Sequence, residues 1–178
     1  MKEFSISIKV ELFFLRQVVL TLINSILFHR SFSEAVPKDV LVLNKITTVQ
    51  LDDPQLQSQI ESRIDAFMAT LNSQSTYILS FALYEKLLAT QKRGWFGLES
   101  KEEEKIEIER WNINISIVPS SDEATVVDQV NSALFYITKT SIDFKDHIPA
   151  ITNTDRYPFP FQILFSNDAS GVWKLPFL

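Results

Sequence analysis

The sequence predicts an α+β fold, with a mixed or antiparallel sheet and about three helices packed on it, in a single domain over residues 1–178. Three observations support this class. Apolar and polar residues alternate in several segments, which is typical of strands, and apolar residues recur at helical spacing in three others. The resulting order is strand, helix, helix, long hairpin, helix and terminal strands. Hydrophobic residues make up 46% of 178 residues, which is enough for a substantial core.

The chain begins with a predicted strand over about residues 3–10, where apolar residues alternate with polar ones at Phe4, Ile6, Ile8 and Val10. A long helix over about 11–29 follows and is apolar around most of its circumference, so we expect it to be central. Polar residues interrupt this stretch at Arg16, Gln17 and Asn24, and it falls short of a membrane span or a signal peptide. We therefore interpret it as a buried core helix.

Two short apolar runs at 40–43 and 46–49 are typical of a small hairpin or irregular β region. A second helix is predicted from Pro54 to Leu71, because Asp53 is a good cap residue and proline suits the first helical position. Its apolar face faces the core, and its opposite face is polar, with Gln55, Ser58, Gln59, Ser62 and Arg63.

A long hairpin is predicted next, with its first strand beginning at Thr76; a helix remains an alternative there, since leucines also recur at helical spacing. In the returning segment Ile106 and Ile108 share one parity, whereas Trp111, Ile113, Ile115 and Ile117 share the other. A flat strand cannot change its buried face, so this switch predicts a β-bulge near Glu109-Arg110. Residues 99–105 form a charge run that we expect to be solvated.

The third helix is predicted to start at a capping box, Ser120-x-x-Glu123. The tail has no helical period and leads into a strand at 162–165. Pro158 and Pro160 lack amide hydrogens on the same strand edge. We therefore expect the start of this strand to be unpaired on that side, at a sheet margin or lifted off the sheet.

Composition narrows the functional classes. The net charge of −5 argues against a nucleic-acid-binding surface, and the absence of cysteine excludes disulfides and thiolate chemistry. The two histidines have no partner at motif spacing, and the three glycines form no phosphate-binding loop. Asp52-Asp53 could suggest a metal, but helix capping explains Asp53. We expect a cytoplasmic protein that holds no cofactor or metal. An enzyme assembled from scattered carboxylates stays an alternative, although no motif favours one.

The most informative local feature is an aromatic pair, Trp95 and Phe96, at the tip of the predicted hairpin in the segment Lys92-Arg93-Gly94-Trp95-Phe96-Gly97. Hairpin tips are normally polar because they face water. Burial of an aromatic side chain is worth roughly 1.5–3 kcal/mol, so such a pair either folds back onto its own chain or inserts into a partner. Aromatic anchors are typical binding hot spots.

Four segments together carry a resemblance to a known family: Leu27-Phe28-His29-Arg30-Ser31 at the end of the first helix, Lys92–Phe96 at the tip, Trp111 in the returning strand, and Tyr157 to Phe165 in the tail. Their order resembles the HORMA domain of spindle-checkpoint and chromosome-axis proteins, over nearly the whole chain. Within that family the chain looks most like a small subunit of the autophagy-initiation kinase complex.

The resemblance implies a non-catalytic adaptor. It would pair with and stabilise a second HORMA-domain protein of the autophagy-related protein 13 type, within a complex that holds a serine/threonine kinase. Trp95 and Phe96 would form a finger that recruits downstream autophagy factors. In animal members one residue separates the two aromatics, whereas here they are adjacent, which changes their relative direction.

The resemblance also implies a C-terminal belt in the open arrangement, a cytoplasmic location with recruitment to the phagophore assembly site, and only indirect membrane association. Candidates for the pairing surface, by analogy, are His29, Arg30, Gln55, Ser58, Gln59 and Ser62. The alternative function is an autonomous HORMA-type clamp that wraps a peptide under its belt in another signalling or checkpoint pathway.

Overall fold

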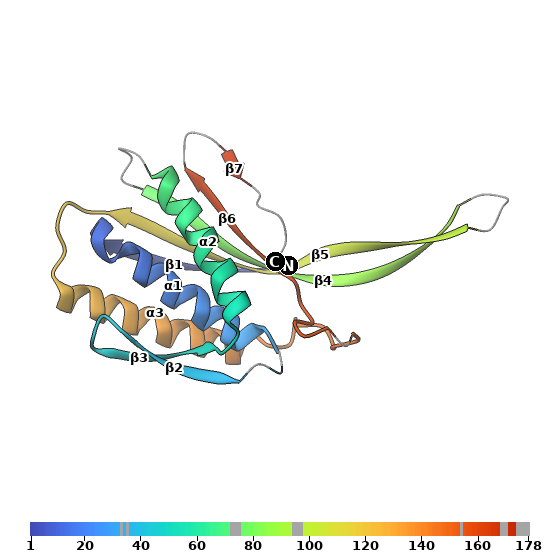
Figure 1. Cartoon of the computed structure of the whole chain (residues 1–178), viewed down its shortest axis with the longest axis horizontal. Coiled ribbons are helices and arrows are strands. Elements are labelled where there is room, and N and C mark those ends of the chain that lie inside the picture. The colour runs from blue at the N-terminus through green and yellow to red at the C-terminus, as the bar shows by residue number, and fades with distance from the viewer. Residues whose placement is uncertain are drawn as a thin grey trace.

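The computed structural model describes residues 1–32, 34, 36–71, 76–93, 98–153, 155–167 and 171–173 (Figure 1). In chain order the elements are β1 (Lys2–Val10), α1 (Leu12–Arg30), β2 (Pro37–Val42), β3 (Ile46–Leu51), α2 (Pro54–Thr70), β4 (Thr76–Arg93), β5 (Leu98–Ile117), α3 (Glu123–Asp143), β6 (Phe161–Asn167) and β7 (Gly171–Trp173). The described residues thus form an α+β fold with three helices, as the sequence predicts.

The main sheet is mixed and has the strand order β1-β5-β4-β6-β7. β1 runs parallel to β5, and the other neighbouring strands are antiparallel. One face of the sheet is apolar and packs against the helices. Its buried side chains include Ile6, Ile8, Leu79, Phe81, Trp111, Ile113 and Ile163. The other face carries Ser5, Ser7, Ser80, Asn112 and Asn114 at paired positions, as expected for a face turned towards water.

Helix α1 is the central helix of the core. Its side chains at Leu15, Val19, Leu22, Ile23 and Ile26 are fully buried, which confirms the prediction of a core helix. By length and mean hydropathy α1 could also cross a membrane, but core helices of soluble proteins pass the same test. The predicted 40–49 hairpin is confirmed as β2 and β3, which pack on α1. Leu43 and Asn44 turn the chain with positive φ angles of 50° and 49°.

The predicted start of α2, with Asp53 as cap and Pro54 at the first helical position, is confirmed. The Asp53 side chain accepts hydrogen bonds from the backbone N–H groups of Gln55 and Leu56, both at 3.1 Å, and Pro54 occupies the first helical turn.

The predicted capping box at the start of α3 is wrong. The cap is Asp122, which accepts from the Thr125 N–H at 3.2 Å. Ser121 accepts from the Glu11 N–H instead, and Glu123 pairs with Lys45 at 3.4 Å. A carboxylate one residue before the helix therefore replaces the box, and Ser120 lies two residues before this cap.

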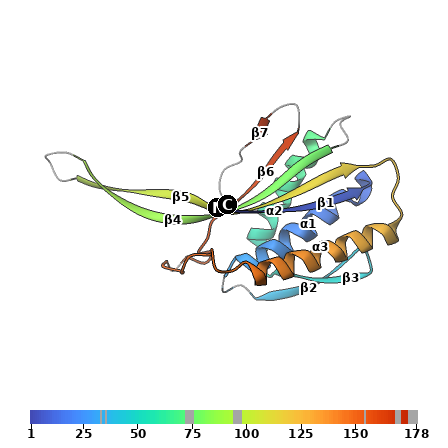
Figure 2. The ribbon, with the colours of Figure 1, turned by 180° about the vertical axis from the view of Figure 1, so that it is seen from behind.

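The segment from Thr76 is a strand, which settles the helix alternative, and β4 and β5 form one long hairpin (Figure 2). Leu83 lies opposite Glu109 but Tyr84 lies opposite Glu107, so Ile108 is an extra residue on β5. The predicted bulge is confirmed immediately before Glu109. Ile108 is 9% exposed, whereas Ile106 is 42% exposed, so the buried face changes at this point.

β6 pairs with β4 along Phe161–Ser166, and the Pro160 carbonyl accepts from the Tyr84 N–H. On its other side only Phe165–Asn167 pair with a described strand, β7. Within the described residues, the start of β6 is thus unpaired on one edge, as the two prolines predict.

Candidate functional site

Beyond the bulge, β4 and β5 leave the body of the domain as a two-stranded arm (Figure 1). The strands pair as far as Arg93 opposite Leu98. Trp95 and Phe96 belong to residues 94–97, which connect the two strands and lie outside the described residues. The described part of the candidate site is therefore the arm itself and the contacts that fix its base.

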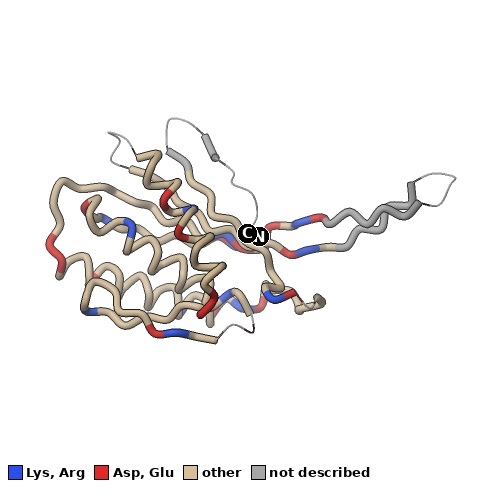
Figure 3. The backbone as a smooth tube through the Cα atoms, in the orientation of Figure 1, with Lys and Arg blue, Asp and Glu red and all other residues tan. Residues whose placement is uncertain are grey.

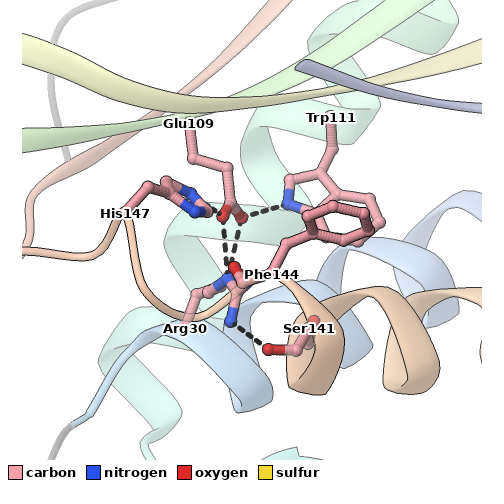
Figure 4. Close-up of polar contacts among 6 residues, drawn as sticks. All are labelled: Arg30, Glu109, Trp111, Ser141, Phe144 and His147. Carbon is pink, nitrogen blue, oxygen red and sulfur yellow. Dashed lines mark hydrogen bonds and ion pairs between the residues drawn. The ribbon is translucent and has the colours of Figure 1, made fainter. Parts of the chain in front are cut away.

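A buried polar cluster fixes the base of the arm on the helical side of the sheet (Figure 4). Its centre is Glu109, whose side chain is fully buried. Glu109 accepts two hydrogen bonds from Arg30 Nε at 2.8 and 3.0 Å, one from His147 Nε2 at 2.7 Å and one from Trp111 Nε1. The carboxylate is thus paired with a cation and further hydrogen-bonded, which a buried charge requires.

Arg30 links this cluster to the end of α3. Its guanidinium donates from Nη1 to the Ser141 carbonyl at 2.9 Å and from Nη2 to the Phe144 carbonyl at 3.2 Å. A cation is favourable beside the carbonyls of a helix C-terminus. Arg30, one of the candidates for the pairing surface, is only 1% exposed, because it neutralises a buried acid.

A second group of polar contacts lies beside the same bulge, on the face of the sheet that is turned away from the helices. Arg110 donates to both Glu107 oxygens at 2.6 Å, and the Tyr84 hydroxyl donates to Gln162 at 3.1 Å. Burial, followed by the negative charge of Glu107, raises the pKa of Tyr84. Glu107 and Glu109 flank the bulged Ile108, so both sides of the bulge are held by an arginine–carboxylate pair.

We call residues 144–160, which connect α3 to β6, the strap; residue 154 is not described. The strap is attached at several points besides His147. The Tyr157 hydroxyl donates to Asp53 at 2.6 Å, Arg156 lies 3.3 Å from the same carboxylate, and Lys86 pairs with Asp155. The Tyr157 hydrogen bond and the backbone N–H of Leu56 lower the pKa of Asp53. Burial and this carboxylate raise the pKa of Tyr157.

The predicted surface residues of α2 are exposed, namely Gln55, Ser58, Gln59 and Ser62. His29 is half-buried and lies elsewhere, against α3, where its Nε2 is 3.2 Å from Thr138 Oγ1. Burial, and then the charge of Arg30, lowers the pKa of His29. The structure therefore does not join His29 to the polar face of α2.

An exposed apolar stripe on α3 is a feature that the sequence analysis missed. Phe135 is 71% exposed and Ile142 is 62% exposed, and the two residues are seven positions apart, on one side of the helix. Thr138 lies between them on this side, so its partner His29 borders the stripe. The sequence signal was present, because these two apolar residues do not belong to the inner set of Val126, Val130, Ala133 and Ile137.

The described residues carry many charged side chains but no candidate metal centre. Among them, no group of three or more His, Asp or Glu side chains is placed to hold a metal ion. Basic and acidic residues are interspersed along the described backbone (Figure 3). What the polar clusters do physically is anchor the arm and the strap to the body of the domain.

Comparison with known proteins matches the sequence of this chain to a known family. The family model described as autophagy-related protein 101 matches residues 7–155. Autophagy-related protein 101 of Arabidopsis thaliana is 27% identical over 194 aligned residues, covering 92% of this chain and 86% of the plant protein. The family consists generally of non-catalytic adaptors in the autophagy-initiation complex. The chain therefore belongs to the autophagy-related protein 101 family.

Proposed function

We propose that this protein is a non-catalytic adaptor of the autophagy-initiation complex, which pairs with a second HORMA-domain protein of the autophagy-related protein 13 type. The observation that carries the proposal is the family match over residues 7–155. The complex would also hold a serine/threonine kinase. The protein would be cytoplasmic and recruited to the phagophore assembly site, with membrane association through its partners.

The pairing surface that we propose is the α3 stripe with His29 at its border. Phe135 and Ile142 leave large apolar surfaces in water, and covering each would contribute roughly 1.5–3 kcal/mol. A set of exposed apolar side chains at helical spacing is typical of a helix that docks on a partner. The candidate residues of α2 (Gln55, Ser58, Gln59 and Ser62) are polar and exposed, as on a solvated helix face, and form the competing surface in the test.

Paired purification tests this surface. The double variant Phe135→Ala/Ile142→Asp should lose the HORMA partner while its thermal midpoint stays close to that of the wild type. Phe13→Ala is the matched control, because Phe13 is 80% exposed at the other end of the helical layer, on α1. Loss of pairing in Gln55→Ala/Gln59→Ala, but not in the α3 variant, would assign pairing to α2 instead.

We further propose that Trp95 and Phe96 form the recruiting finger at the end of the arm. The pairing of β4 with β5 up to Arg93 and Leu98 supports this role, since the arm that these strands form leaves the body of the domain. Trp95→Ala/Phe96→Ala should leave folding and pairing intact while blocking autophagic flux in cells. If this variant unfolds, the two rings belong to the core and the finger assignment fails.

We also propose that β6 and β7 are the belt in its open arrangement. Two observations support this: β6 lies beside β4, and the strap that precedes it is attached at His147 and Tyr157. The alternative, an autonomous peptide clamp, requires the belt to move. It predicts two slowly interconverting monomers on ion exchange, whereas we expect one.

A further inference from the structure

Strand β1 is an edge strand of the main sheet, and one side of its backbone has hydrogen-bonding groups directed away from the sheet. Lys9 shows which side this is. Its N–H donates to Gln129 Oε1 at 2.8 Å, and its carbonyl accepts from Gln129 Nε2 at 2.9 Å. Since backbone groups alternate along a strand, the N–H and carbonyl groups of Glu3, Ser5 and Ser7 are also directed outward.

The Gln129 side chain is a primary amide that forms the two hydrogen bonds a neighbouring strand would form with Lys9. Two residues further on, the Glu11 N–H is likewise bonded to a side chain, Ser121 Oγ. Within the described part of the chain, no such partner is found for the outward groups of Ser5 and Ser7. The edge is therefore closed by α3 and its preceding loop at one end, and open over Glu3–Ser7.

A groove of about 430 Å³ runs beside this open edge. Ser5 and Ser7 line one wall, and three α3 residues at a spacing of four, Asp128, Ser132 and Tyr136, line the other. Asp128 is exposed and has no ion pair within the described residues. Tyr136 is 40% exposed, so its ring is accessible. A carboxylate and an aromatic ring in one groove are complementary to a basic side chain.

We propose that the β1 edge is a docking site for an extended segment of a partner protein, which adds a strand beside Glu3–Ser7 and places a lysine or arginine between Asp128 and Tyr136. The backbone groups provide the hydrogen bonds of strand addition, and the groove provides the preference for a basic residue. This site is separate from the α3 stripe and from the arm, and it does not depend on either of those roles.

Proline substitution tests the site because the critical amides point outward. Ser5→Pro and Ser7→Pro each remove an outward N–H while leaving the ladder to β5 intact, and proline is tolerated on such an edge. Ser7→Ala is the matched control, since it removes only the hydroxyl. The probe is a peptide selected from a display library of random linear peptides on the full-length wild-type chain.

The selected peptides should contain a basic residue and should bind each proline variant at least about tenfold more weakly than wild type, with Ser7→Ala unchanged. Gln129→Ala should strengthen binding several-fold, because it frees the Lys9 backbone groups, and Asp128→Lys should weaken it. In the complex, the Ser5 and Ser7 amides should gain protection from hydrogen exchange.

Either of two results would overturn the proposal: no peptide is enriched, or the enriched peptides bind both proline variants as tightly as wild type. If a proline variant fails to fold, two other measurements test the proposal: the peptide affinity of Asp128→Lys, and the hydrogen exchange of the Ser5 and Ser7 amides in the wild-type complex. Unchanged affinity in Asp128→Lys together with unprotected amides would then exclude this edge.

Discussion

The Glu109 cluster allows a quantitative test, by Glu109→Gln, of whether the arm base depends on a buried charge pair. The variant keeps the size of the side chain but leaves the Arg30 guanidinium charged at about 2% side-chain exposure without an anionic partner. Breaking a buried pair by removing one partner costs about 3–5 kcal/mol. For a chain of this length, each kcal/mol lowers the thermal midpoint by about 2–4 °C, so we expect a fall on the order of 10 °C.

The assay is urea unfolding followed by tryptophan fluorescence and by circular dichroism, with coincidence of the two transitions as the test of two-state behaviour. Asp65→Asn is the control, because it removes another arginine–carboxylate pair, Arg16–Asp65 at 2.7 Å, in which both side chains are about half exposed. Exposed pairs contribute about 0–1 kcal/mol. If Glu109→Gln costs no more than the control, the cluster does not hold the arm base as argued.

Three further outcomes are expected. Ser141→Ala should leave stability unchanged or raise it by up to about 1 kcal/mol in urea unfolding, because the buried Ser141 hydroxyl has no partner among the described residues; a loss above that size would reveal a hidden bond. The pKa of Asp53 is depressed below its ordinary 3.8 in the folded state, so its stabilising contribution is present above that pH and is lost as pH falls through the lower folded-state pKa. The stability advantage of wild type over Asp53→Asn should therefore shrink in unfolding series below about pH 4, and a constant difference would contradict this. At the β2–β3 turn, Asn44→Gly should be nearly neutral, whereas Asn44→Val should cost about 1–2 kcal/mol, because φ is 49°; equal midpoints would refute the strain argument.

Local patterns in the sequence predicted most of the fold. The alternation in β1, the proline after Asp53 and the parity switch around Ile108 each depend on neighbouring residues, and the structure confirms all three. The capping box failed for a physical reason. Ser120 lies two residues before the actual cap, Asp122. The intervening Ser121 accepts from the Glu11 N–H, a contact across 110 positions that no local pattern can show.

The same reasoning explains what was missed in the candidate site. Glu109 has the parity of the buried Trp111 and Ile113, which could have indicated its burial. Its partners could not be predicted, because Arg30 and His147 lie 79 and 38 positions away and meet Glu109 only when the helices pack on the sheet. The exposed stripe of α3 could have been predicted from the fact that Phe135 and Ile142 are apolar residues outside the set that faces the core.

The extra residue at Ile108 has a consequence for the length of the arm. On the side of the domain body, β5 also pairs with β1 and β4 also pairs with β6, whereas beyond Ile108 the described ladder of β4 and β5 joins these two strands alone. Adding two residues to each outer strand would extend the reach of the connecting segment by roughly 7 Å and preserve which side each residue faces. The arm can therefore act as a spacer whose length changes in fixed steps while the rest of the protein keeps its structure.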